Sequence, residues 1–168
     1  KTLLVWARQL LRQVSRWLPG RALIVVADSN FAAIELLAAL LPRMTCITRL
    51  RLDARLFAPA PPRRPGTIGR PRVKGDRLPT LEAVLADAAT RWARVTIPGW
   101  YGEGPRAVDL ATGSGVWHHP GLPVIPLRWV LVRDPEGRFD SQALLSTDPT
   151  LTAAEIVGYY VRRWQVEV

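Results

Sequence analysis

The sequence is poor in residues that build covalent cross-links or nitrogen–sulfur metal sites, because it has one cysteine and two histidines in 168 residues. The single cysteine, Cys46, excludes an internal disulfide and a cysteine-cluster zinc site. His118 and His119 are adjacent, so on a strand they would point to opposite faces. No third ligand accompanies them. We therefore interpret the two histidines as a loop pair rather than a metal site.

Long apolar runs and nucleotide-binding motifs are also missing. No run approaches the roughly 18 apolar residues of a membrane span. The sequence contains neither G-x-x-x-x-G-K-[ST] nor G-x-G-x-x-G, the glycine-rich motifs that cradle phosphates. Gly113-Ser114-Gly115 lacks the strand–turn–helix context of a nucleophile elbow. Nucleotide binding and serine-based hydrolysis therefore have no support in the sequence.

Acidic side chains are scarce, with 14 Asp and Glu against 23 Lys and Arg, and residues 1–27 contain none. The formal net charge of +9 and the pI of about 11.1 favour a polyanionic partner, nucleic acid first. A solvated basic surface is the alternative. Hydrophobic residues still make up 48% of the chain, which is enough for one domain with a real core.

The first segment, residues 3–18, has the apolar periodicity of a helix. The face that we expect to be buried consists of apolar residues at helical spacing: Leu3, Ala7, Leu10, Leu11, Val14, Trp17 and Leu18. Three arginines step by four along another face, and we interpret them as a solvated stripe, with DNA contact as the alternative: Arg8, Arg12 and Arg16.

An acidic residue follows the first predicted strand. Residues 21–27 form an apolar run rich in β-branched side chains, typical of a strand covered on both faces in a parallel sheet. Asp28 comes next, then a helix over 31–41 that Ser29 or Asn30 can cap, and then a second, parallel strand over 45–52. Strand, acid and helix in this order place a side chain at the carboxyl edge of a sheet, where α/β proteins hold their sites. The alternative for Asp28 is helix capping.

From Pro59 onward prolines alternate with arginines and lysines, which predicts an exposed basic loop that either contacts phosphates or serves as a solvated linker. We interpret residues 58–140 as a β-rich insertion between a first core segment, 1–57, and a returning segment, 141–168. Within and after it we expect a short helix over 80–89 and strands, with glycines such as Gly113 and Gly115 marking turns. The strands are 91–97, 107–110, 124–133 and 143–146.

The last stretch predicts a helix that begins with a capping box formed by Thr152 and Glu155. Asp148, which precedes a proline, fits the turn ahead of this helix. Tyr160, Arg163 and Glu167 are spaced i, i+3 and i+7, so they share one face. A neighbouring stripe is apolar: Val157, Val161, Trp164 and Val168. The alternative is an ordinary amphipathic helix with a surface ion pair.

The spacing of Tyr160, Arg163 and Glu167 resembles the Y-x2-R-x3-E signature of bacterial insertion-sequence transposases of the D-D-E type. The stretches ADSNFA…RLRLDARLF and GRPRVKGDRLPTL resemble segments of the same group. The resemblance implies a ribonuclease-H-like α/β fold, a mixed sheet with flanking helices interrupted by a β-rich insertion. It also implies that Asp28 and Glu167 are catalytic, metal-binding acids, and that Tyr160 and Arg163 lie toward DNA phosphates.

The resemblance implies metal-dependent cleavage and strand transfer of double-stranded transposon-end DNA in the bacterial cytoplasm, at the nucleoid. It implies two Mg²⁺ ions, with Mn²⁺ as a substitute, and a transposase dimer on DNA. The family uses three acids and two are matched, so we expect the first Asp and the opening strands to lie outside this chain. We expect the chain alone to be inactive. The alternative is a non-catalytic basic nucleic-acid-binding module or a decayed transposase remnant.

Overall fold

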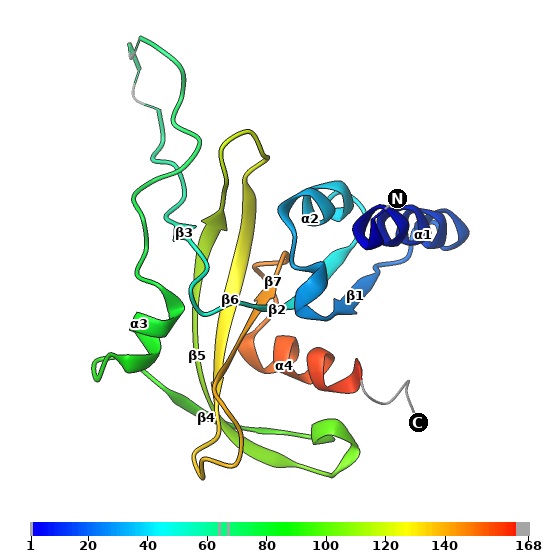
Figure 1. Ribbon diagram of the computed structural model, residues 1–168, viewed down its shortest axis with the longest axis vertical. Coiled ribbons are helices and arrows are strands. Elements are labelled where there is room, and N and C mark those ends of the chain that lie inside the picture. Colours follow the sequence, from blue (N-terminus) through cyan, green and yellow to red (C-terminus); the bar gives the residue numbers. More distant parts are fainter. Residues whose placement is uncertain (1, 64, 67, 164–168) are drawn as a thin grey trace.

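The structure is a computed structural model that describes residues 2–63, 65–66 and 68–163 (Figure 1). Four α-helices and two 3₁₀ turns alternate with the strands. The helices are α1 (Leu3–Trp17), α2 (Ile34–Leu40), α3 (Leu81–Ala86) and α4 (Ala153–Val161), and the 3₁₀ turns are η1 (Ser29–Phe31) and η2 (Trp100–Gly102). The strands are β1 (Ile24–Ala27), β2 (Thr45–Leu50), β3 (Leu56–Phe57), β4 (Ala93–Ile97), β5 (Arg106–Trp117), β6 (Ile125–Arg133) and β7 (Gln142–Ser146).

The seven strands form one mixed sheet in the order β1-β2-β7-β6-β5-β3, with β4 pairing with β5 off this path. β1 runs parallel to β2, whereas the other strand pairs are antiparallel. This confirms the predicted mixed α/β sheet with flanking helices. In the described part of the chain, no helix is long and apolar enough to cross a membrane.

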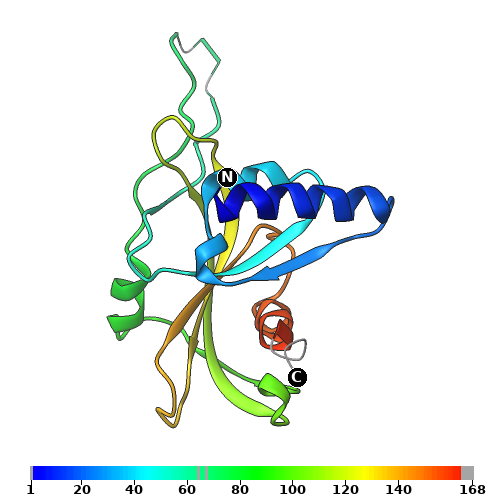
Figure 2. The same ribbon diagram turned by 45° about the vertical axis from the view of Figure 1, so that its right-hand side comes forward.

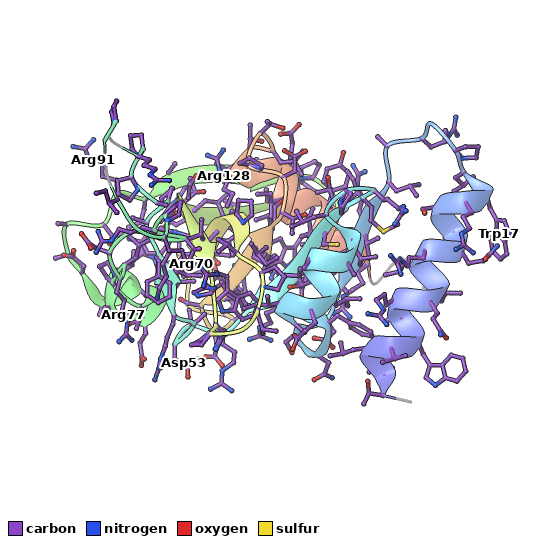
Figure 3. All side chains as sticks on the ribbon, turned by 90° about the horizontal axis from the view of Figure 1, so that it is seen from above. Trp17, Asp53, Arg70, Arg77, Arg91 and Arg128 are labelled. Carbon is purple, nitrogen blue, oxygen red and sulfur yellow. The ribbon has the colours of Figure 1, made fainter. Side chains whose placement is uncertain are left out.

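Strands from all three predicted segments hydrogen-bond within this sheet. The segment 58–140 contributes β4, β5 and β6, and 141–168 contributes β7, which joins β6 to β2 of the first segment. The boundaries at 57 and 140 remain a prediction. The long basic loop leaves the sheet after β3 (Figure 1), where Ala58 donates to the carbonyl of Asp76 at 2.8 Å. The arginines of the loop that the structure describes are exposed, among them Arg70 and Arg77 (Figure 3).

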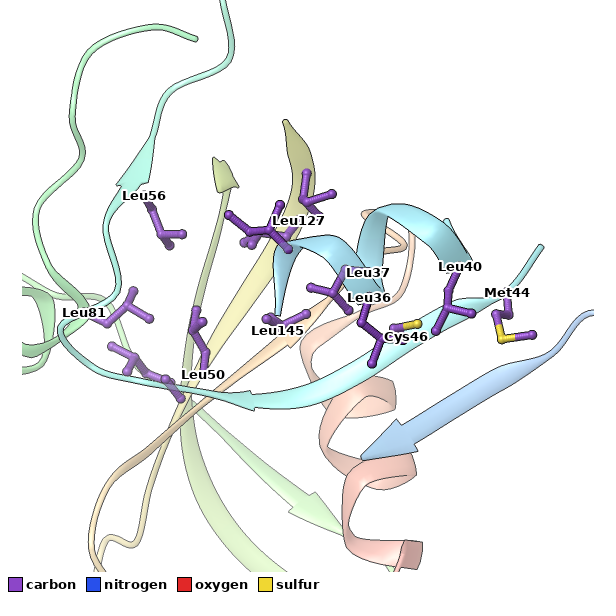
Figure 4. Close-up of a cluster of buried hydrophobic side chains, with 14 of the residues drawn as sticks. Leu36, Leu37, Leu40, Met44, Cys46, Leu50, Leu56, Leu81, Leu127 and Leu145 are labelled. Carbon is purple, nitrogen blue, oxygen red and sulfur yellow. The ribbon is translucent and has the colours of Figure 1, made fainter. Parts of the chain in front are cut away.

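Two hydrophobic clusters cover opposite faces of the sheet, with α1 and α2 on one side and α4 on the other (Figure 2). Alternation along β2 divides its side chains between them. Cys46 packs beneath α2, and Leu50 lies in the same cluster but nearer to Leu81 than to α2 (Figure 4), whereas Ile47 packs with Ile156 and Val157 of α4. The period of two therefore places the residue after Thr48, Arg49, on the α4 face.

Helix α1 confirms the predicted helix and part of its predicted buried face. The helix packs on the core cluster through Ala7 and Leu11, as predicted, and through Leu4. Leu10 and Trp17 of the predicted face are 61% and 66% exposed, Leu3 and Leu18 are exposed as well, and Trp17 points away from the rest of the molecule (Figure 3). The sequence could not fix the rotation of the helix about its axis, because that rotation depends on where α2 lies.

Strand β1 is parallel to β2, as predicted, but it is not covered on both faces. Within the described residues it ends the path of the sheet, Ile24 is exposed, and Val25, Val26 and Ala27 are half-buried. A run of β-branched residues therefore reports strand propensity here rather than full burial.

Strand β5 is longer than predicted, because it runs through Gly113 and Gly115, which we had expected to mark turns. The physical reason is a close approach across the sheet. A β-carbon on Gly113 would lie 2.5 Å from the Cζ2 atom of Trp129, its partner on β6. Glycine at this position makes room for an indole ring rather than for a turn.

The segment leading into α4 confirms two local predictions. Asp148 shapes a turn by accepting a hydrogen bond from the amide of Thr150 at 2.8 Å, and the two hydrogen bonds from Thr150 lower the pKa of its carboxyl. Thr152 and Glu155 form the predicted capping box, with the amide of Thr152 donating to Glu155 at 2.8 Å and the amide of Glu155 donating to Thr152 at 3.2 Å.

Asp109 on β5 holds the sheet together through two arginines from neighbouring strands. It accepts from Arg94 at 2.9 Å and from Arg133 at 3.2 Å, with its side chain 8% exposed. Hydrogen bonds from Arg94 lower the pKa of the Asp109 carboxyl. A lowered pKa stabilises the fold above the unfolded-state pKa of about 3.9. This stabilisation is lost as the pH falls through the folded-state value.

We therefore expect Asp109→Asn to reduce the free energy of unfolding at pH 7 by roughly 1–3 kcal/mol, a difference that shrinks below about pH 4. Urea unfolding followed by circular dichroism across this pH range measures it. The matched control is Asp53→Asn, which removes an exposed ion pair with Arg51 and should change stability little, because solvent screens such pairs. A pH-independent cost for Asp109→Asn would contradict the prediction.

Candidate active site

Asp28 stands where β1 leaves the sheet. The parallel register pairs Ala27 with Thr48, so Asp28 and Arg49 are the next residues on two adjacent strands. The Asp28 side chain is 51% exposed, and its Oδ1 accepts from the amide of Ser29 at 2.6 Å. Asp28 therefore caps the 3₁₀ turn η1. This turn separates β1 from α2, so the prediction that Ser29 or Asn30 caps a helix beginning at residue 31 is wrong.

The aromatic and the basic residue of the predicted site, Tyr160 and Arg163, lie near the C-terminal end of helix α4. Val157 and Val161 are buried, as predicted, but Tyr160 is buried too, at 4% exposure. The phenol belongs to the hydrophobic cluster on this face rather than to a polar row at the edge of the core. Arg163 follows the helix, and its guanidinium lies 5.5 Å from the centroid of the Tyr160 ring.

These residues converge across the sheet edge. Nη1 of Arg163 lies 3.9 Å from Oδ2 of Asp28, and the Arg163 side chain is 21% exposed. Burial raises the pKa of the Tyr160 hydroxyl, Arg163 opposes this shift, and the charge of Asp28 adds to it. The ends of β1 and α4 thus bring Asp28, Tyr160 and Arg163 into one electrostatic group, although they are about 130 residues apart in sequence.

Glu167, the second predicted acid, lies outside the described residues, as does Trp164. Within the described part, no group of three or more His, Cys, Asp or Glu side chains could hold a metal ion. Asp28 alone fits the role of a ligand for a hard cation: it is half exposed, Oδ1 takes the hydrogen bond from Ser29, and Oδ2 faces Arg163. The pairing of Asp28 with Glu167 stays a prediction.

Sequence reasoning missed two residues of this group, Arg49 and Tyr101. Arg49 lies on the α4 face of β2, beside Asp28, and a register argument on the two predicted parallel strands could have found it. Tyr101 comes from the turn between β4 and β5, and its position depends on long-range packing that no local pattern reveals. Burial raises the pKa of Tyr101, and the charges of Arg163 and Arg49 oppose that shift.

A basic hollow continues the site away from α4. It has a volume of about 250 Å³ and begins at Ser29, next to Asp28. Its wall includes Arg49, Arg55, and the rings of Trp117 and His119. Arg51 lines it too, but Asp53 of the same wall pairs with Arg51 at 2.7 Å. The two remaining arginines suit an anionic ligand with flat groups.

A family described as DDE superfamily endonuclease matches residues 1–103 of the chain. The matched residues include Asp28, Arg49 and Tyr101, whereas Tyr160 and Arg163 lie beyond them. No curated protein matches the chain. The match covers more than half of the 168 residues, and the mixed α/β sheet with four helices is consistent with a ribonuclease-H-like DDE domain. The chain belongs to the DDE superfamily endonuclease family.

Proposed function

We propose that the chain is the catalytic region of a D-D-E transposase that cleaves and joins double-stranded transposon-end DNA with two Mg²⁺ ions, for which Mn²⁺ can substitute. Nucleases of this family act on DNA and generally use divalent metals. One observation carries the proposal: the 3.9 Å approach of Arg163 to Asp28. It sets a cation suited to phosphate beside an acid suited to a metal.

In the proposed site Asp28 and Glu167 hold the metal ions. Such ions, when bound, stabilise the attacking and leaving oxygens of a phosphodiester. Arg163 binds a phosphate with its planar guanidinium. The Tyr160 hydroxyl, protonated at neutral pH like that of any ordinary tyrosine, donates a hydrogen bond to a phosphate oxygen. A dimer on two DNA ends belongs to the same proposal.

A second candidate function is DNA binding without catalysis, and the small number of acidic side chains at the site favours it. Asp28 is a single carboxylate among the described residues of the site, while the net charge is +9 and the loop after β3 is basic and exposed. Two-ion chemistry needs several acidic ligands. We therefore expect this polypeptide alone to bind DNA without cutting it. Mg²⁺-dependent nicking by the chain, lost in Asp28→Ala, would contradict that expectation.

The test of the metal role compares wild type with Asp28→Asn in binding to a short DNA duplex at constant ionic strength. Without Mg²⁺ we expect Asp28→Asn to bind several-fold more tightly, because a negative charge beside the phosphate is gone. With Mg²⁺ we expect the order to reverse, because only wild type retains the carboxylate that holds the ion. Mg²⁺ also competes as a counterion and weakens the DNA binding of both proteins alike. The ratio of their two affinities therefore reports only the effect of Mg²⁺ at Asp28.

Fluorescence anisotropy of a labelled duplex measures both affinities. If Mg²⁺ leaves the ratio unchanged, Asp28 does not bind metal and the binding-module function stands instead. If neither protein binds duplex DNA with a steep salt dependence, both proposed functions fail, since phosphate contact requires such a dependence.

A further inference from the structure

Tyr101 has an unusual backbone conformation. Its φ and ψ are 46° and 31°, the left-handed region, and it is the one non-glycine residue with positive φ in the part of the chain that the structure describes. Gly99 and Gly102 on either side also have positive φ, at 67° and 85°. Glycine adopts this region freely, whereas a bulky side chain does so at a cost in free energy. Residues held this way cluster at functional sites.

The neighbouring tryptophan fixes this turn. Trp100 is buried, and its ring stacks on Phe139 at 5.3 Å and meets Tyr101 edge-on at 5.1 Å. The amide of Trp100 donates to the carbonyl of Gly104 at 2.7 Å. Trp100 therefore anchors the turn in the core. Tyr101 follows Trp100 directly, so the position of the Tyr101 ring is restricted.

The turn delivers Tyr101 to the candidate site. Both ribbon views place η2 beside the C-terminal half of α4 (Figures 1 and 2), and Tyr101 packs against the cluster that contains Tyr160. Arg163, just beyond the end of α4, and Arg49, on β2, both act electrostatically on its hydroxyl. Two guanidinium groups and two phenols therefore act on one another here, and Asp28 acts on Tyr160 of this group. Arginines and hydroxyls together are the composition of a site for an anionic oxygen.

We propose that Tyr101 is a phosphate-binding residue, whose hydroxyl donates to the same DNA phosphodiester group that Arg163 binds, with Arg49 as the second positive charge. This inference rests on the function proposed above. The tyrosine occupies a backbone position that a glycine would fill without strain.

The test is Tyr101→Phe, which keeps the ring and the backbone and removes only the hydroxyl. We expect its affinity for a short DNA duplex to fall roughly tenfold, the effect of losing one hydrogen bond to a charged group. We expect the urea midpoint to stay unchanged, and the slope of log affinity against log salt as well, because no charge is lost. The matched control is Tyr159→Phe, a half-buried tyrosine of α4 that packs against the same cluster; its affinity should not change.

Wild-type affinity in Tyr101→Phe, or an equal loss in Tyr159→Phe, overturns the inference. Arg163→Gln separates this failure from that of the proposed function. If Arg163→Gln weakens binding and Tyr101→Phe does not, the phosphate site stands and only the role of Tyr101 is wrong. If neither substitution weakens binding, the proposed function falls with it.

Discussion

Gly113→Ala is expected to lower the free energy of unfolding by about 3 kcal/mol, the upper end of the usual cost of overpacking. The added methyl would stand 2.5 Å from Cζ2 and 2.8 Å from Cε2 of Trp129. Real β-carbons do not approach other atoms so closely, so the indole or one of the two longest strands must shift. Gly113 and Trp129 are directly paired in the register of β5 and β6. Urea unfolding measures the effect.

Two variants show whether the contact with Trp129 is the cause. Gly158→Ala is the matched control, because nothing lies within 4 Å of a β-carbon at Gly158 in α4. Alanine there should stabilise the helix by up to about 1 kcal/mol. Trp129→Leu should rescue part of the loss in Gly113→Ala, giving a coupling of roughly 1–3 kcal/mol in a double-mutant cycle. Additive effects of the two substitutions would contradict the proposed steric cause.

The sequence predicted the local parts of the fold that depend on neighbours in the chain. The capping box of Thr152 and Glu155, the turn at Asp148 and the parallel pair β1 and β2 involve short-range patterns, and the structure confirms them. Long-range packing decided the rest. The stripe on α1 that is buried depends on α2, and Gly113 sits in a strand because Trp129 arrives from β6.

The candidate site likewise has a part that local sequence patterns predicted and a part that depends on long-range packing. The spacing of Tyr160 and Arg163 indicated one helical face, and the resemblance tied it to Asp28; the structure brings Arg163 and Asp28 to 3.9 Å. Burial of Tyr160 could not be read from that spacing, because Trp100 and its neighbours come from a distant turn. Tyr101 could not be found either, since nothing local indicates that a tyrosine would accept a left-handed backbone.

Arg163→Gln is expected to reduce affinity for duplex DNA by roughly 10- to 100-fold, the range for losing a hydrogen-bonded charge. The slope of log affinity against log salt should fall by about one, because one phosphate contact is lost. Glutamine keeps similar bulk over the Tyr160 ring, which the guanidinium faces at 5.5 Å, so the fold should survive. Anisotropy titrations at several salt concentrations measure both quantities, and urea unfolding verifies the fold.

The adjacent arginine supplies the control that makes this result specific. Arg162 is exposed and lies near the ring of Tyr159 rather than toward Asp28, so Arg162→Gln removes the same charge one residue away. A general basic surface would lose equal affinity in both variants, since long-range attraction depends on net charge rather than on position. A site built around Asp28 and Arg163 predicts that Arg163→Gln costs far more than Arg162→Gln. Equal losses would leave a positively charged domain that binds DNA without a defined phosphate site.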